Sequence, residues 1–359
     1  MEVPLFLAFA VVMLVVVLFF NAQAAKQRAE VLEAAAEQYG LKHATGSPTS
    51  RVSGTVDGIP LVIEAVERGS GDSQQIRCRV EAEPTCVLPQ DLYVGSEGLL
   101  ASFAKVVGMQ DVEVGDPEFD RAAILRGARP DHLQQVFESP RLRLASRFLV
   151  SNSNAGSVES GKVAMETSVF QAHSIAPLVD QVLETARALD DAILGPWQVF
   201  AEDASLELDT SARVVRASGV TPEGYPIEVR GALETGQTTI TVELPTPLPN
   251  GLVAMAGEHP GAVALGDPIL DGRVSVKGAN ADAVRQLCRD AAVREELLAA
   301  LSVAPDSRVE DGVVRIVATA ASVDALRARY RDACGLAHAL VERLAAVPSR
   351  AHHRRRVPE

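Results

Sequence analysis

The sequence predicts an α+β protein in which an N-terminal transmembrane helix precedes two tandem duplicated domains, each an antiparallel sheet with helices on one face. Three observations lead to this prediction. The chain opens with a long apolar run, a landmark motif returns 151 residues after its first appearance, and strands precede helices in the same order in both halves. Strands and helices segregated along the chain are typical of an α+β fold rather than of a parallel α/β fold.

Length and charge narrow the class of protein. The chain has 359 residues, which favours two domains. Its net charge is -13, from 34 Lys+Arg against 47 Asp+Glu, and this argues against a general nucleic-acid binder. Aromatic residues make up 4%, too few for a protein that works by stacking on bases, and four cysteines do not make a disulfide-rich scaffold.

The first apolar run is long enough to predict a membrane span. Leu5–Phe20 holds sixteen residues without a polar side chain, and with its neighbours it forms a predicted anchor over residues 3–25 in the lipid bilayer. Lys26 and Arg28 follow the run and no basic residue precedes it, so the bulk of the chain is expected in the cytoplasm, with the periplasmic side as the alternative. A cleaved signal peptide is a further alternative, because Ala22-Gln23-Ala24 resembles a cleavage site, although a basic n-region is missing.

Residues 26–40 are predicted to continue the anchor as a helical stalk. From Ala24 to Tyr39 the sequence has no Gly or Pro and is rich in strong helix formers, and Gly40 is typical of a helix C-terminus. The apolar stripe is too short to predict a coiled coil.

The rest of the chain is a tandem duplication. Gly115–Asp120 (GDPEFD) returns as Gly266–Asp271 (GDPILD). A period of this length indicates a duplicated domain rather than a solenoid repeat, so we expect one fold over residues 41–194 and again over residues 195–347. Further matches are Gly127 with Gly278, Asp131 with Asp282 and Gln135 with Gln286, and Leu88–Leu92 matches Leu248–Leu252 at an offset of 160.

Both copies carry the same expected elements. Alternating apolar residues predict three opening strands, with Asp57-Gly58 and Glu223-Gly224 in the first turns. After the Gly-Asp-Pro turn we expect another strand, a helix starting near Pro130 or Asn280, a hairpin and a long terminal helix. The predicted strands include Arg51–Thr55, Pro60–Glu67, Gln75–Glu83, Arg213–Gly219, Pro226–Ala232, Thr238–Leu244 and Val313–Ala318, and the terminal helices are Ala172–Ile193 and Val323–Ala346.

An acidic pattern recurs in both copies and invites a metal-site hypothesis, since carboxylate clusters hold hard cations. Each aspartate also has a structural explanation, as a turn residue, at the start of a strand or in the first turn of a helix. No bidentate Glu stands at a calcium-loop spacing, so no metal ligand is assigned. The residues are Asp116, Asp120 and Asp131 in the first copy and Asp267, Asp271 and Asp282 in the second.

No catalytic or cofactor-binding residue is assigned either. The sequence contains no nucleophile elbow, Walker loop, dinucleotide fingerprint or zinc-ligand spacing, and this favours a protein that is not an enzyme. Cys288 and Cys334 fall where the first copy has Phe137 and Leu183, so both are expected to be buried. A Cys78–Cys86 disulfide is the alternative if the domain lies in an oxidising compartment. The histidines His43, His132, His173, His259 and His338 are scattered along the chain.

The C-terminal residues 348–359 hold a basic cluster, His352–Arg356 (HHRRR). A disordered, solvated tail is expected, and contact with anionic lipid headgroups is the alternative.

One block resembles a known group of proteins. Phe119-Asp120, Asp131 and Pro140–Arg143 (PRLR) are similar to a segment of uncharacterised bacterial membrane-anchored proteins that carry a domain of unknown function. The resemblance implies a membrane-bound α+β domain and supplies no active-site or binding residue. The second copy lacks the Phe and the Pro of this block.

Two classes of function follow. The duplication and the absence of a catalytic motif favour a membrane-anchored, non-enzymatic binding or scaffold module at the bacterial envelope, with a protein partner of unknown identity. The alternative is an enzyme or small-ligand binder that uses the cleft between the two copies, because domain interfaces often form ligand sites.

Overall fold

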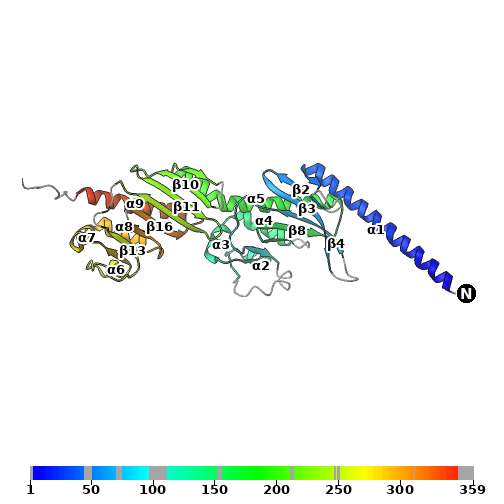
Figure 1. Cartoon of the computed structure of the whole chain (residues 1–359), viewed down its shortest axis with the longest axis horizontal. Coiled ribbons are helices and arrows are strands. Elements are labelled where there is room, and N and C mark those ends of the chain that lie inside the picture. Colours follow the sequence, from blue (N-terminus) through cyan, green and yellow to red (C-terminus); the bar gives the residue numbers. More distant parts are fainter. Residues whose placement is uncertain are drawn as a thin grey trace, which may run out of the picture. The chain divides into compact units, whose positions relative to one another are not determined.

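The structure is a computed structural model that describes residues 3–43, 51–69, 75–96, 111–151, 156–210, 214–245, 248, 251–310 and 312–346. The chain divides into two compact units, Met1–Ile193 and Leu194–Glu359. Each unit holds one antiparallel sheet of eight strands together with its helices (Figure 1).

The sheet of the first unit has the order β1-β2-β3-β4-β8-β7-β5-β6. Its strands are β1 Lys42–His43, β2 Arg51–Val56, β3 Ile59–Arg68, β4 Gln75–Ala82, β5 Tyr93–Gly95, β6 Ile124–Arg126, β7 Ser157–Glu159 and β8 Lys162–Thr167. The helices are α1 Val3–Tyr39, α2 Pro117–Ala122, α3 Pro130–Val136, α4 Pro140–Ser151 and α5 Ala172–Asp203, the last of which continues into the second unit.

The sheet of the second unit has the order β14-β13-β15-β16-β12-β11-β10-β9, which read from β9 matches the first sheet strand by strand. This match confirms a tandem duplicated α+β fold. The strands are β9 Glu207–Asp209, β10 Val214–Val220, β11 Pro226–Ala232, β12 Gln237–Glu243, β13 Val253–Ala256, β14 Val274–Lys277, β15 Arg308–Glu310 and β16 Val313–Thr319. The further helices are α6 Pro268–Asp271, α7 Ala281–Cys288, α8 Ala291–Leu301 and α9 Val323–Ala346.

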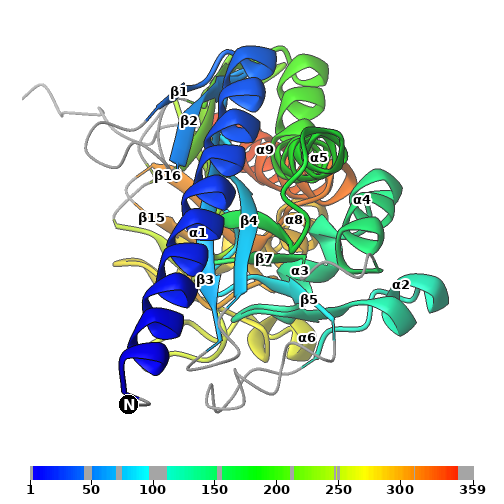
Figure 2. The ribbon, with the colours of Figure 1, turned by 90° about the vertical axis from the view of Figure 1, so that its right-hand side faces the viewer.

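Helices cover one face of each sheet and form the core with it. In Figure 2, α4 and α5 lie together on one side of β3 and β4, and the Gln181 side chain of α5 donates a hydrogen bond of 3.0 Å to the backbone oxygen of Ala145 in α4. The strands turn alternate apolar side chains toward these helices, as strand geometry requires. Ile63, Val80 and Met165, on β3, β4 and β8, are buried.

A helix also opens each copy. The first is the end of α1, which covers the predicted helical stalk up to Tyr39, and the second, the end of α5, was not predicted. The amide of Leu41, just after α1, donates to the oxygen of Ala36 at 2.8 Å, and the amide of Leu206, just after α5, donates to the oxygen of Ala201 at 2.8 Å. The intervening Gly40 has a left-handed backbone, as does Ser205 after α5. The terminal helix of the first copy therefore does not stop at Ile193 as expected. It runs on to Asp203 and also serves as the opening helix of the second copy.

Several short elements depart from the predictions. Where one helix was expected after Pro130 or Asn280, each copy has two, α3 with α4 and α7 with α8. The Gly-Asp-Pro segments are not simple turns before a strand, because each begins a short helix, α2 or α6. A proline in the first turn suits a helix start, since its missing N–H would have no partner there.

Within the part of the chain that the structure describes, no helix is both long enough and apolar enough to cross a membrane. The predicted span Leu5–Phe20 lies within α1, and the side chains of most of its residues are outside the described part. The transmembrane helix remains a prediction.

Candidate functional site

Four of the six recurrent aspartates accept hydrogen bonds from backbone amides. Asp116 caps α2 by accepting hydrogen bonds from the amides of Glu118 and Phe119 at 3.1 and 3.2 Å. Asp267 caps α6 in the same way. Among the described residues, no group of three or more His, Cys, Asp or Glu side chains is placed to hold a metal ion.

The second aspartate of each motif also has equivalent partners. Asp120 accepts a hydrogen bond of 3.0 Å from the amide of Val114, and Asp271 accepts one of 2.9 Å from the amide of Leu265. Both aspartates lie in short helices and do not begin a strand. The other expectation, that they bond the preceding turn, is the one these hydrogen bonds support. The helix starts where Asp116 and Asp267 supply the caps, which a turn-and-strand interpretation overlooked.

An arginine on α4 of the first copy, and its equivalent on α8 of the second, lies near the capping aspartate. Arg143 Nε is 2.9 Å from Asp116 Oδ2, and its Nη1 donates to the backbone oxygens of Phe137 and Glu138. Hydrogen bonds from the amides of Phe119 and Glu118 and from Arg143 lower the pKa of Asp116. The equivalent Arg294 Nη1 lies 3.7 Å from Asp267 Oδ2.

The cysteines behave largely as core residues. Cys288 is buried as Phe137 is, and Cys334 is buried as Leu183 is, as expected from their equivalent positions. Cys78 is buried and Cys86 is half-buried, and both are free thiols in this structure, so the alternative disulfide is not formed. The basic cluster His352–Arg356 lies outside the described residues.

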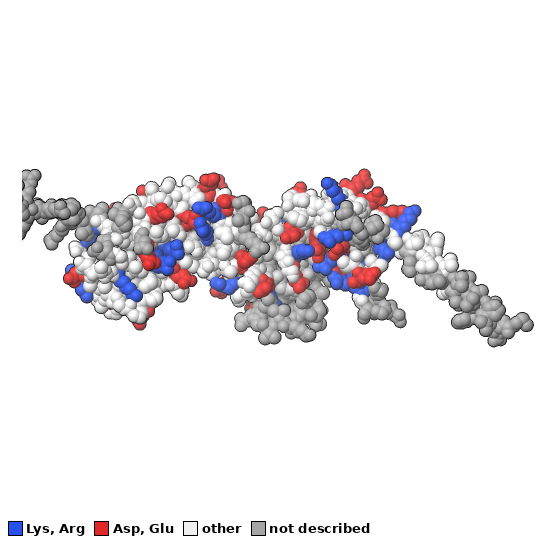
Figure 3. Space-filling view, in the orientation of Figure 1, with Lys and Arg blue, Asp and Glu red and all other residues white. Residues whose placement is uncertain are grey.

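The open face of the first sheet, the side opposite its core, carries acidic and basic side chains that pair with one another. Glu81 on β4 and Glu166 on β8 are buried carboxylates, and they lie on the opposite side of the sheet from the core residue Val80. Glu166 accepts a hydrogen bond of 3.1 Å from Arg68 Nε, and Glu81 Oε2 is 3.1 Å from Lys162 Nζ. Arg79 Nη2 is 2.5 Å from Glu81 Oε1. Figure 3 shows positive and negative side chains gathered over this region of β3, β4 and β8, and further ones over the second sheet, where Glu228 pairs with Arg216 and Arg230.

The second sheet lacks these carboxylates at the equivalent positions. In the sheet register, Arg79 of β4 lies directly opposite Glu166 of β8. At the equivalent positions, Thr239 of β12 lies directly opposite Val317 of β16. Likewise Thr241 stands where the first sheet has Glu81. The register of these strands is the same in both copies, and the side chains on the open face differ.

A pocket of about 350 Å³ opens on this face of the second sheet. Arg308 and Arg315 line it from β15 and β16, and they are directly opposite each other in the sheet. Arg315 has a buried Nε atom with no hydrogen-bond partner, and no carboxylate among the described residues pairs with it. Other lining residues are Gln237, Thr239, His259 and Val317.

His259 is held at the edge of this pocket by the backbone. Its amide donates a hydrogen bond of 2.8 Å to Ser275 Oγ, and its Nε2 lies 2.9 Å from the oxygen of Ala256. Ser275 Oγ in turn donates to the oxygen of Gly257 at 2.6 Å. These bonds fix the segment after β13, so the ring of His259 is positioned beside the two arginines.

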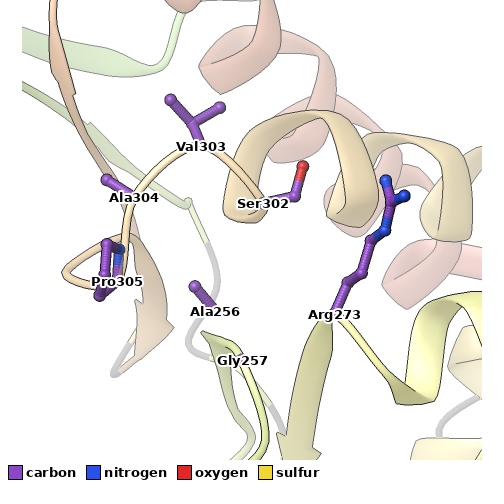
Figure 4. A pocket seen from close by; sticks show the side chains of 7 residues that line it. All are labelled: Ala256, Gly257, Arg273, Ser302, Val303, Ala304 and Pro305. Carbon is purple, nitrogen blue, oxygen red and sulfur yellow. The ribbon is translucent and has the colours of Figure 1, made fainter.

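A second pocket, of about 420 Å³, lies between the end of β13 and the segment that follows α8 (Figure 4). Arg273 and Ser302 are the lining residues with polar side chains, and the remainder of its wall is small or apolar, from Ala256, Gly257, Val303, Ala304 and Pro305. Ser302 Oγ is already engaged with the oxygen of Leu298 at the end of α8. This pocket offers one free charged group, whereas the pocket on the sheet offers two arginines.

Comparisons with known proteins provide little further information. No family model matches the chain, and no curated protein matches it. The solved structure of the mycobacterial trehalose monomycolate transport factor A is similar to this chain with 16% identity and a TM-score of 0.32, over 46% of this chain and 98% of that chain. A similarity at this level carries no argument about function.

The pocket residues were missed by the sequence analysis, although a signal existed. The offset of 151 places Arg308 on Ser157 and Arg315 on Ala164, so two neutral positions in the first copy become cationic in the second. The two arginines lie on different strands, and their proximity follows only from the pairing of β15 with β16.

Proposed function

We propose that the chain is a non-enzymatic, membrane-anchored binding module whose binding surface is the open face of the second sheet. The observation that carries this proposal is the divergence of the two open faces on one shared fold. Glu81 and Glu166 form ion pairs on the first face, whereas Thr241 and Val317 stand at their positions on the second, where the carboxylate of Glu228 pairs instead with arginines of β10 and β11. A face with a pocket and an arginine, Arg315, that has no carboxylate partner among the described residues suits a binding surface better than a face whose buried carboxylates are already paired.

The N-terminal part of α1 supplies the proposed anchor. Leu5–Phe20 has no polar side chain, and a helix of about 20 residues spans a hydrocarbon core of roughly 30 Å. Those of its side chains that the structure describes are exposed, Phe19 and Phe20 by 65% and 64%, so they are not part of a described protein core. A bilayer would cover them.

The side of the membrane follows from the basic residues. Lys26 and Arg28 come directly after the span, so the domains are proposed to lie in the cytoplasm. A reporter that is active only in the cytoplasm, fused after Glu359, should be active, and one that is active only outside the cytoplasm should be silent. The reverse pattern would refute this orientation while leaving the binding surface untouched.

The binding surface is tested by photo-crosslinking of the full chain in its native membrane. A photoreactive amino acid is placed at Thr239 on the second open face, and in a separate variant at Val62 on the first. Neither position takes part in an ion pair of the described residues. Adducts should form from Thr239 and be several times weaker from Val62. Equal labelling from both positions, or no adduct from Thr239, would refute the proposed surface.

A further inference from the structure

We propose that the pocket on the second sheet binds a phosphate group, with Arg308 and Arg315 as the residues that hold it. This proposal rests on the proposed function, because it assigns a ligand chemistry to the same face. The phosphate belongs either to a lipid headgroup or to a soluble phosphorylated compound, and the two share the same recognition chemistry.

The two arginines are placed where their like charges disfavour the sheet. Arg308 and Arg315 are directly opposite each other on β15 and β16. Side chains at such positions have Cβ atoms only about 4.5–5.5 Å apart, and like charges placed there destabilise a sheet. The first copy has Ser157 and Ala164 at the same positions, so the fold itself does not need charge there.

Arg315 has no carboxylate partner among the described residues, and its buried Nε has no hydrogen-bond acceptor. Arg308 has one carboxylate near it, Glu310, at 3.4 Å from its Nε. In the first copy, Glu166 accepts hydrogen bonds from Arg68, and its position is Val317 in the second copy. A shielded guanidinium N–H without an acceptor is costly, and an anion in the pocket would remove that cost.

A phosphate monoester matches this pair of arginines better than a carboxylate does. A phosphate monoester carries a charge of about −1.5 to −2 at neutral pH and three terminal oxygens, which matches two guanidinium groups. A carboxylate carries one charge and suits a single arginine fork. Thr239 and Gln237 add a hydroxyl and an amide as further donors. Asp306 also lines the pocket and is exposed, and its one negative charge against two arginines leaves the pocket with a net positive charge.

The test uses the full chain in neutral detergent, with binding measured by calorimetric titration. Inorganic phosphate is one probe and short-chain phosphatidic acid is the other, so the two arms separate a soluble source from a lipid source. Arg315→Gln and Arg308→Gln should each weaken binding by about tenfold or more, because each removes a charge-assisted contact. Arg51→Gln is the matched control, since it removes the same charge from an exposed strand position of the first copy and should leave binding unchanged.

A fourth variant keeps the test decisive if an arginine variant unfolds. Val317→Glu places the carboxylate of the first copy beside Arg315 and should abolish binding, with folding checked by thermal unfolding. Binding of either probe that is lost in these variants supports the proposal and identifies the source. No binding of either probe, binding unaffected by Arg315→Gln, or equal binding of acetate would overturn it. If crosslinks from Thr239 persist in that case, the proposed binding surface stands and only its phosphate chemistry fails.

Discussion

Glu166 of β8 and Val317 of β16 occupy the same position in the two copies, yet one is a paired carboxylate and the other is apolar. Glu166 is directly opposite Arg79, and Val317 is directly opposite Thr239. Because strand order and register agree, this difference lies in side-chain chemistry alone. The first copy therefore has a carboxylate acceptor for arginines at this position, and the second copy has none there.

Glu166→Val should destabilise the first copy. Its removal leaves Arg68 without its buried acceptor, while Arg79 keeps Glu81, and we expect the free energy of unfolding to fall by about 2 kcal/mol, since Arg68 is half-exposed and partly hydrated. Chemical denaturation monitored by circular dichroism measures this loss. The double variant Glu166→Val, Arg68→Met should lose less than the sum of the two single changes. A strictly additive result would show that the ion pair contributes nothing.

The two equivalent arginines on α4 and α8 should differ in their contribution to stability. Arg143 bonds Asp116 and two backbone oxygens at 2.8 to 2.9 Å, whereas Arg294 is 3.7 Å from its aspartate. Arg143→Met should cost about 2 kcal/mol of unfolding free energy, and Arg294→Met below about 1 kcal/mol. Each variant serves as the control for the other in the same denaturation experiment. Equal losses of unfolding free energy in the two variants would contradict the expected difference between the two arginines.

The sequence predicted the duplication and many of the longer strands because these depend on local signals. Pro226–Ala232, for instance, is a strand with the bounds expected from its alternation. The extension of α5 was missed because Gly195-Pro196 signals a helix end, and tertiary packing overrides it. Trp197 and Phe200, which follow that signal, are buried in the second unit. Packing of an apolar face commonly decides helix length over local propensity.

The candidate site was harder to predict because its residues are brought together by sheet topology. Arg308 and Arg315 are polar positions on two short strands, and each one alone looks like an ordinary solvated side chain. Their cross-strand pairing becomes visible with the register of β15 and β16. The loss of Glu166 lies at the offset of 151, but Glu81 matches Thr241 at an offset of 160, so the two losses come together only when β4 and β8 are compared with β12 and β16.

His132 should make the stability of the first copy depend on pH. Burial lowers its pKa to about 4, with a further contribution from the positive Arg129. Between pH 4 and 6.5 the unfolded chain therefore binds more protons than the folded chain, so stability rises with pH across this window and is lost as pH falls. The loss at pH 4 should be on the order of 3 kcal/mol relative to neutral pH. Denaturation of His132→Leu across this range should show a flatter pH dependence, and an unchanged slope would exclude His132 as the cause.

Val15→Asp should release the chain from the membrane. A charged residue near the centre of a span costs about 2.5 to 3.5 kcal/mol on insertion, and Leu5–Phe20 is a short span with little to spare. Val220→Asp is the matched control, because both valines are 58% exposed and Val220 lies on the second sheet. Carbonate extraction of membranes should recover the control in the pellet and the Val15 variant largely in the supernatant. Retention of both variants in the pellet would argue against this anchor.

Crosslinking from Thr239 in a chain that also carries Thr241→Glu and Val317→Glu tests most directly whether the open face of the second sheet is the binding surface. These changes place carboxylates in the second copy at the positions of Glu81 and Glu166 in the first. There they can pair with Arg308 and Arg315. The account predicts that adducts seen in the parent chain disappear while thermal unfolding still shows a folded protein. Adducts of undiminished intensity from the folded variant would contradict it.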